Sequence, residues 1–173
     1  MELAEEAGDA TFLLDLLNST PIIDGVQRDE LETAPAARAW LRARGHSGSA
    51  AEVQAVRTAR TALQAVSRGA RRPKSLAPLL DEVSFRPVVN EDGVQWRLAA
   101  PADRAAAARA VLAWDALRRM RPGRLRPCEN PECALFLIDR SKPNKARWCS
   151  MAACGNRMKA RRHYERTRTN RTH

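Results

Sequence analysis

Four cysteines, all in the last third of the chain, constrain its structure more than any other feature of the sequence. Their spacing is Cys-x4-Cys, then fifteen residues, then Cys-x4-Cys. Two short cysteine turns joined by a segment of hairpin length can bring four thiolates together around a tetrahedral zinc ion. The same spacing also allows two disulfides or four unrelated buried thiols. We predict one structural zinc ion, and its expected ligands are Cys128, Cys133, Cys149 and Cys154.

Four cysteine ligands would fill the zinc shell, so no position remains for a catalytic water. The rest of the sequence offers no set of nucleophile, base and orienting acid and no phosphate-binding glycine loop. We therefore expect that the chain is not an enzyme. The cysteine segment also has few apolar residues with which to build a core, so its folding should depend on the metal.

The charge of the chain is unevenly distributed. Residues 1–120 carry 16 Lys and Arg against 16 Asp and Glu, whereas residues 121–173 carry 14 against 4. The whole net charge of +10 therefore lies in the part that holds the cysteines. Such asymmetry indicates a polyanionic partner, and nucleic acid is a more natural one than a membrane.

The N-terminal sequence opens with acidic residues and lacks the basic start and apolar stretch of a secretory signal. No apolar run approaches the length of a membrane span. We expect a cytoplasmic, nucleoid-associated protein with no membrane partner. In such a reducing compartment clustered cysteines favour a metal over disulfides.

The first 121 residues are predicted to form a mostly helical domain. Apolar residues recur at helical spacing, and Pro21, Gly45 and Gly69 mark places where helices should stop. Ser49 and Glu52 have the spacing of a capping box. The predicted helices cover residues 10–18, 29–44 with a restart at Pro35, 49–69, 75–83 and 101–120.

One β-hairpin interrupts this helical pattern. Residues 85–98 contain two β-prone runs around the turn sequence Asn-Glu-Asp-Gly at 90–93. The predicted fold class is α+β, mainly α: a helical N-terminal domain with a β-hairpin, and a small C-terminal zinc-bound module of hairpin and helix. We expect Trp40, Trp96 and Trp114 to lie in the core of the first domain.

The second cysteine pair lies at the head of a basic helix. Ser150 can cap a helix that carries Cys154 in its first turns and continues to Arg168. Only Glu165 opposes the cations of this run, whereas a merely solvated helix usually mixes both signs, so we favour a nucleic-acid surface over a solvated one. The predicted nucleic-acid contacts are Lys142, Lys145, Arg147, Arg157, Lys159, Arg161, Arg162 and Arg166.

Residues 148–163, WCSMAACGNRMKARRH, carry the run Cys-Gly-Asn-Arg at 154–157. Together with Asp139-Arg140-Ser141 upstream, they resemble the CGNR zinc finger proteins. The start of the chain, with LLDLLNST and DELETAPAARAWLRARG, resembles more loosely the ABATE domain that accompanies this finger, a stress-induced transcription regulator domain.

The resemblance implies a bacterial transcription regulator whose four cysteines bind zinc. It implies an ABATE-like domain at residues 1–121 that could sense a small-molecule effector, and a DNA-binding finger at 128–168. Residues 122–127 have the composition of a linker, and residues 169–173 that of a disordered tail.

We assign hypothetical roles to the three residues after the last cysteine. Gly155 would permit close backbone packing beside the metal, Asn156 would brace the hairpin by hydrogen bonds, and Arg157 would face a phosphate or a base edge.

Duplex DNA is the preferred partner, and two alternatives stay open. One is an RNA-binding module, which the sparse aromatic residues of the finger disfavour. The other is a zinc-stabilised protein-interaction domain whose basic helix meets an acidic partner. A homodimer is expected because a lone small finger usually binds weakly.

Overall fold

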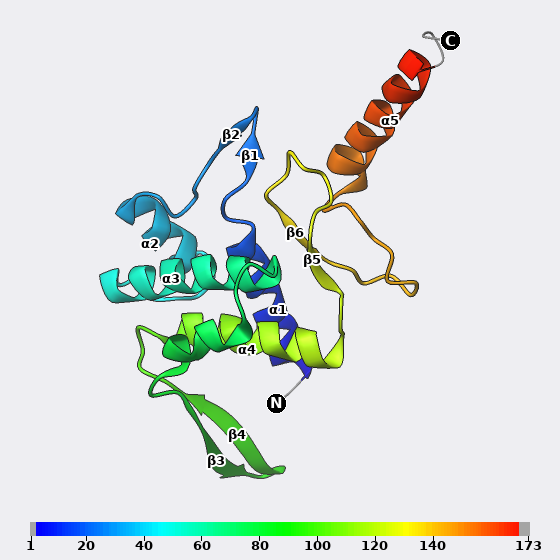
Figure 1. Cartoon of the computed structure of the whole chain (residues 1–173). Helices are drawn as coiled ribbons and strands as arrows, with labels where there is room; N and C mark the ends of the chain where they lie inside the picture. The colour runs from blue at the N-terminus through cyan, green and yellow to red at the C-terminus, as the bar shows by residue number, and fades with distance from the viewer. Residues whose placement is uncertain (1–2, 170–173) are drawn as a thin grey trace.

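The computed structural model describes residues 3–169 (Figure 1). Two parts can be distinguished: a helical body, residues 3–120, and a finger, residues 124–169. Helices dominate and the strands form three separate two-stranded ribbons, which confirms the predicted α+β, mainly α class. The body contains α1 (Leu3–Leu17), β1 (Ile22–Ile23), β2 (Val26–Gln27), α2 (Ala34–Arg42), α3 (Ala50–Ser67), η1 (Pro73–Leu80), β3 (Ser84–Asn90), β4 (Gly93–Ala99) and α4 (Ala105–Met120).

The helix boundaries follow local signals in the sequence. The Thr33 side chain accepts a hydrogen bond from the Ala36 N–H, and Pro35 lies in the first turn of α2, which confirms the predicted restart. The Ser49 hydroxyl caps α3 by accepting from the Glu52 N–H. The Glu52 carboxylate is buried but accepts from the Gly48 N–H, so the capping box is shifted by one residue.

The core of the body lies between α1, α3 and α4 (Figure 1). The leucines of α1 and the valines of α3 meet a face of α4 that is rich in small residues, because alanine allows the helices to approach closely. Trp40 and Trp114 are buried in this core as predicted. Within residues 3–169, no helix has the length and apolar character needed to cross a membrane.

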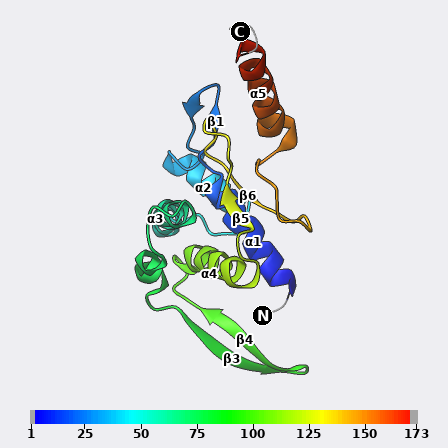
Figure 2. The same ribbon diagram turned by 45° about the vertical axis from the view of Figure 1, so that its right-hand side comes forward.

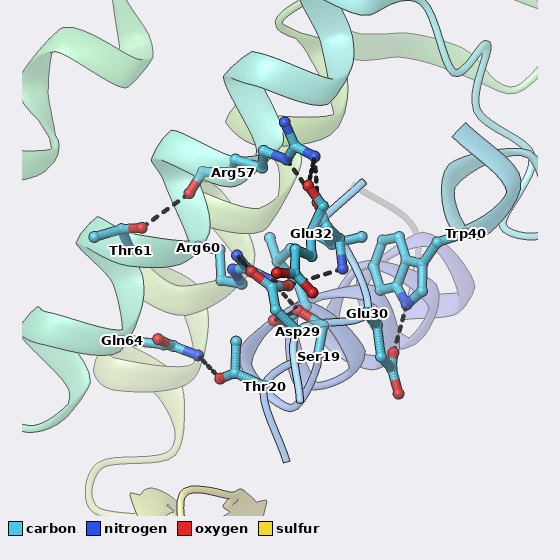
Figure 3. Close-up of polar contacts among 12 residues, drawn as sticks. Ser19, Thr20, Asp29, Glu30, Glu32, Trp40, Arg57, Arg60, Thr61 and Gln64 are labelled. Atoms are coloured by element: carbon cyan, nitrogen blue, oxygen red, sulfur yellow. Dashed lines mark hydrogen bonds and ion pairs between the residues drawn. The ribbon is translucent and has the colours of Figure 1, made fainter. Parts of the chain in front are cut away.

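A polar cluster fixes the segment between α1 and α2 onto α3 (Figure 3). The buried Arg60 guanidinium donates to both carboxylate oxygens of Asp29 and to the hydroxyl of Ser19. Nearby, the Gln64 side chain donates to the Leu17 carbonyl and to the hydroxyl of Thr20. These groups satisfy one another, so the cluster acts as a structural clasp inside the body.

The β3–β4 hairpin projects from the body as an isolated ribbon (Figure 1). Asn90 pairs with Gly93, so the two residues between them form a tight turn within the predicted sequence. The expected burial of Trp96 is wrong: the residue is 58% exposed. The reason is that, within residues 3–169, no third strand pairs with this ribbon, whereas tryptophan side chains are on average highly buried.

The finger contains β5 (Leu125–Pro127), β6 (Phe136–Ile138), the π-helical turn η2 (Met151–Gly155) and α5 (Asn156–Thr169). The predicted linker at residues 122–127 is therefore wrong in its second half, because 125–127 pair with β6 as a strand. Of the predicted tail, Thr169 ends α5 and residues 170–173 lie outside the described residues.

The finger is docked onto the body at a seam formed by Asn18, Arg68 and Phe136. Phe136 is buried in the core of the body, although it belongs to β6. The Asn18 side chain forms two hydrogen bonds with the backbone of Phe136: it accepts from the Phe136 N–H and donates to the Phe136 carbonyl. The Arg68 guanidinium lies 4.3 Å from the Phe136 ring centroid and donates to the Ala134 carbonyl. The two parts are thus joined by apolar and polar contacts.

Candidate metal centre and nucleic-acid interface

The four cysteines converge from two turns of the finger. Cys128 follows β5, Cys133 closes the turn after it, Cys149 precedes η2, and Cys154 lies within η2. Their sulfur atoms all lie within 4.8 Å of one another. The four-ligand set predicted from the spacing is therefore assembled in space.

The distances between the sulfurs fit a metal and exclude disulfides in this structure. The Cys133 and Cys149 Sγ atoms are 3.8 Å apart, and those of Cys149 and Cys154 are 3.6 Å apart. A disulfide requires about 2.05 Å. A zinc–sulfur bond of about 2.3 Å gives an edge of about 3.8 Å in a tetrahedron of four thiolates. The donor atoms and their separations therefore suit zinc.

Backbone and side-chain N–H groups surround the sulfurs. The Cys149 N–H donates to the Cys128 Sγ over 3.4 Å, and the Leu135 N–H donates to the Cys133 Sγ over 3.5 Å. The side chain of Asn130 donates to the Cys154 Sγ over 3.3 Å. Four thiolates around Zn²⁺ leave two net negative charges, and such donors stabilise that charge.

Asn130 is a site residue that the sequence analysis missed. It is 1% exposed, its side-chain oxygen accepts from the Glu132 N–H, and its carbonyl accepts from the Cys133 N–H. It therefore shapes the first cysteine turn and contacts a sulfur of the second pair. A turn-forming asparagine between two cysteines was the available signal.

The four thiols lie close enough to shift one another's pKa values. Burial, with the neighbouring thiols, raises the pKa of Cys133 to about 11 and raises the pKa of Cys149 further. Burial also acts to raise the pKa of Cys154, but hydrogen bonds from Asn130 and the neighbouring thiols outweigh it and lower the value. Four thiolates therefore need a compensating positive charge, which a divalent metal would supply.

The residues that follow Cys154 behave differently from one another. A Cβ added at Gly155 would lie 2.8 Å from the Met151 Sδ and 3.3 Å from the Trp148 Cδ1. The predicted close packing is thus present, against side chains of the same turn. The hypothesis that Asn156 braces the hairpin is wrong, because its amide donates to the Ala152 carbonyl one helical turn away. Asn130 performs the bracing instead.

A buried aspartate orders the loop between β6 and the second cysteine pair. The Asp139 carboxylate accepts from the N–H and hydroxyl of Ser141, from the Ala146 N–H and from Arg126. These hydrogen bonds lower the pKa of Asp139 to about 2, and the bond from the Ser141 hydroxyl contributes most, followed by the bond from the Ala146 N–H. The carboxylate is thus charged at neutral pH and folds the loop that carries Lys142 and Lys145.

The structure divides the predicted cations of α5 between two faces. Arg157 and Arg161 lie on the face toward Glu132, with nitrogen to oxygen distances of 3.9 and 3.7 Å. Arg161 also pairs with Glu165. Arg147, outside α5, pairs with Glu129. These three predicted contacts are partly neutralised by acids of the finger.

The other face of α5 carries Lys159, Arg162 and Arg166, which we call the cation stripe. Their spacing of three and four residues places them on one side of the helix. All three are exposed, and none forms an ion pair with another described residue. The Arg162 guanidinium lies 5.9 Å from the Trp148 ring centroid, beside the metal turn. The cation stripe is thus a row of positive charges that acidic residues of the described chain do not neutralise, and Arg162 of this row lies close to the cysteine site.

Two comparisons with known proteins bear on the chain. None of the curated proteins compared with it matches. Residues 124–167 match the CGNR zinc finger family. This match spans the four cysteines and nearly all of α5, and it leaves the helical body unassigned, so the ABATE resemblance of the first part stays a prediction. The family match and the four converging thiols support a zinc-binding domain in residues 124–167 that is similar to the CGNR zinc fingers.

Proposed function

We propose that the protein is a zinc-dependent DNA-binding transcription regulator in which one structural zinc ion anchors a basic helix against duplex DNA. The observation that carries the proposal is the cation stripe of Lys159, Arg162 and Arg166. These side chains have no acid to neutralise them among the described residues. An unpaired row of cations on one helix face suits the phosphates of a duplex.

The shape of the finger supports this proposal. Helix α5 leads away from the body in both views (Figures 1 and 2). Its 14 residues span about 21 Å at a rise of about 1.5 Å per residue. The helix is exposed along nearly its whole length. A projecting helix of this size can enter a major groove, which is about 12 Å wide.

The metal supports the interface indirectly. Zinc held by Cys128, Cys133, Cys149 and Cys154 would fix η2 and so the base of α5. With all four ligand positions filled by sulfur, the ion supplies structure and charge rather than a reactive site. A regulator of this kind would act at the nucleoid.

The other cations have graded roles in this proposal. Lys142 and Lys145 lie on the loop ordered by Asp139 and reach phosphates beside the groove. Arg157, near the start of α5, reads a base edge or a phosphate once Glu132 releases it. Arg147 and Arg161 are already paired with acids and contribute less.

The finger has few aromatic side chains available for stacking on bases, and this scarcity favours a duplex over a single-stranded nucleic acid as its partner. Phe136 is buried in the seam, and Trp148 lies half-buried against Arg147 and Arg162. Tyr164 is exposed, but one ring offers little stacking for a single strand.

Paired substitutions on two helices test the role of the stripe. Arg162→Ala with Arg166→Ala removes two charges four residues apart on α5, and Arg38→Ala with Arg42→Ala removes an equally spaced pair from α2. The measurement is binding of a labelled duplex of mixed sequence to zinc-loaded protein over a range of salt. The α5 pair should lose about tenfold in affinity and reduce the salt slope by about two. The α2 pair should bind like the unmodified protein. Equal binding by both pairs would overturn the proposal.

Sequence specificity needs a separate experiment. Zinc-loaded protein is incubated with sheared genomic DNA at physiological salt, and the retained fragments are sequenced, with structured RNA as competitor in a parallel arm. An enriched motif would support a specific regulator. Recovery without a motif, or displacement by RNA at equal concentration, would contradict specific duplex recognition.

A further inference from the structure

An open hollow lies where the end of α4 meets the loop after β6. Its volume is about 490 Å³, within the range of about 300–1,000 Å³ that ligand sites occupy. One wall is formed by residues 120–122 and 124, which lead from α4 into the finger, and the other by residues 140–142 and 144. The end of α4 and this loop lie on the same side of the molecule in both views (Figures 1 and 2). The hollow therefore joins the body to the finger, and none of its lining residues comes from α5.

The lining of the hollow is strongly cationic. Four of its eight residues are Arg121, Arg124, Arg140 and Lys142, and none of the eight is acidic. Within residues 3–169, none of these four cations forms an ion pair. Like charges gathered in one hollow repel one another, and a bound anion relieves that repulsion. We call this site the cationic hollow, and its lining suits a ligand with several negative charges.

The acids of the two segments that form the cationic hollow are already paired. Asp139, the only acid of the loop after β6, has a side chain that is 1% exposed, and its carboxylate pairs with Arg126. Asp115, the only acid of α4, pairs with two other arginines of that helix. The carbonyl end of α4 adds a partial negative charge of about half an elementary charge, which four full positive charges outweigh. The hollow therefore keeps a net positive charge.

Arg124 provides the hollow with a fixed cation. Its guanidinium donates to the carbonyls of Asp139 and Ser141, and these neutral partners do not cancel its charge. Its side chain is half-buried, whereas the other three cations are exposed. The Asn144 amide also donates to the Pro122 carbonyl over 3.5 Å, which ties one wall to the other. These contacts hold the two walls in place before a ligand arrives, so binding costs less ordering of the chain.

We propose that the cationic hollow is a binding site for two or more linked phosphate groups. Guanidinium groups match phosphate oxygens with paired N–H donors, and a lysine adds a point charge. A single phosphate group carries about two negative charges at most, so it would leave two of the four cations without a counter-charge. The three arginines of the hollow were not among the predicted nucleic-acid contacts, whereas Lys142 was.

Linked phosphates can come from two sources. One is a free oligophosphate compound, which would act as an effector at the junction of body and finger. The other is the backbone of a duplex, and this source rests on the proposed function. Both present the same chemistry to the hollow, so one probe tests the site and a second experiment distinguishes the sources.

The site is tested by calorimetric titration of the zinc-loaded full-length protein with inorganic pyrophosphate at fixed ionic strength. The hollow variant, Arg121→Ala with Arg140→Ala, removes two exposed charges and leaves Arg124 to order the loop. The stripe variant, Arg162→Ala with Arg166→Ala, removes the same charge from α5 and controls for general attraction to a basic protein. Zinc content after the titration shows that the metal stays bound.

The unmodified protein and the stripe variant should bind one pyrophosphate with equal affinity, and the hollow variant should bind it about tenfold more weakly or worse. Unchanged affinity in the hollow variant, or an equal loss in both variants, would overturn the proposal.

Binding of a labelled duplex of mixed sequence by the same two variants distinguishes the sources. If the ligand is a free compound, the hollow variant should bind the duplex like the unmodified protein. If it is the duplex backbone, the hollow variant should reduce the salt slope by about two. A stripe variant with full duplex affinity would contradict the proposed function alone, whereas pyrophosphate binding that does not depend on Arg121 and Arg140 would contradict the hollow alone.

Discussion

The helical body and the finger differ in the contacts that hold each of them folded. The body buries a continuous set of apolar side chains between α1, α3 and α4. Among the described hydrophobic residues, the finger buries only Phe136, Leu137 and two of its cysteines, and its turns converge on four sulfurs. A metal in place of a core would leave nearly all of the helix surface free for charge. The basic surface would then depend on the cysteine cluster for its position.

The largest difference between the two parts should appear when zinc is removed. Structural zinc contributes about 10–16 kcal/mol to small zinc domains, far more than the apolar contacts of the finger can replace. Treatment with a strong chelator, or Cys149→Ser, should unfold residues 139–169 and leave α1, α3 and α4 folded. Hydrogen exchange followed by mass spectrometry measures both parts at once. Retained protection in α5 without metal would contradict this division.

Phe136→Ala should produce the next largest effect, because this residue belongs to both parts. Truncating a buried phenylalanine costs about 3 kcal/mol or more. The free energy of unfolding of the body, from chemical denaturation, should fall by that amount although the substitution lies in the finger. Phe136→Leu serves as the control and should cost much less. An unchanged body would mean that the seam carries no energy.

Asp29→Asn should destabilise the body alone, by about 2 kcal/mol, because it leaves the buried Arg60 charge without its partner. This figure is below that of a fully buried pair, because the Asp29 side chain is 34% exposed. Asp24→Asn, at an exposed turn, is the matched control. Denaturant unfolding gives the difference, and zinc content should not change in either variant.

The contribution of Asp29 should also depend on pH. Hydrogen bonding from Arg60, opposed by partial burial, lowers its pKa below the ordinary value of 3.8. A carboxylate with a lowered pKa stabilises the fold above its ordinary pKa and loses that contribution as the pH falls through the lowered value. The difference in stability between the unmodified protein and Asp29→Asn should therefore be constant near neutral pH and shrink below about 4. A difference that grows on acidification would contradict the ion pair.

Asn130→Ala should have the smallest effect and should act on the finger alone. Loss of a donor to a metal-bound sulfur weakens metal affinity by about tenfold or somewhat more. Competition with a chromophoric chelator measures the zinc affinity. Asn156→Ala is the control, since its amide contacts only the preceding helical turn. Equal loss in both variants would contradict the role given to Asn130.

Features of the fold and the site that depend on residues a few positions apart could be predicted from the sequence. The cap at Ser49, the restart at Pro35 and the convergence of the cysteines all follow from short spacings. The small β1–β2 hairpin was equally accessible, because Asp24 and Gly25 both adopt positive φ in its turn and this dipeptide is a strong hairpin signal.

Features that depend on distant parts of the chain could not be predicted. The exposure of Trp96 depends on the lack of a covering element among the described residues, which no local pattern encodes. The docking of Phe136 in the body requires a partner, Asn18, that lies 118 residues away. Likewise the division of α5 into a paired and an unpaired face is created by Glu132, in another turn of the finger.

The most direct test of the central claim is the salt dependence of duplex binding with and without zinc. Fluorescence anisotropy of a labelled duplex is measured against zinc-loaded and against chelated protein at several salt concentrations. The logarithm of the affinity of the zinc-loaded protein should fall steeply and linearly with the logarithm of the salt concentration, and the chelated protein should bind much more weakly. Equal affinity in the two forms, or zinc-dependent binding that does not respond to salt, would contradict a metal-anchored cation stripe as the nucleic-acid surface.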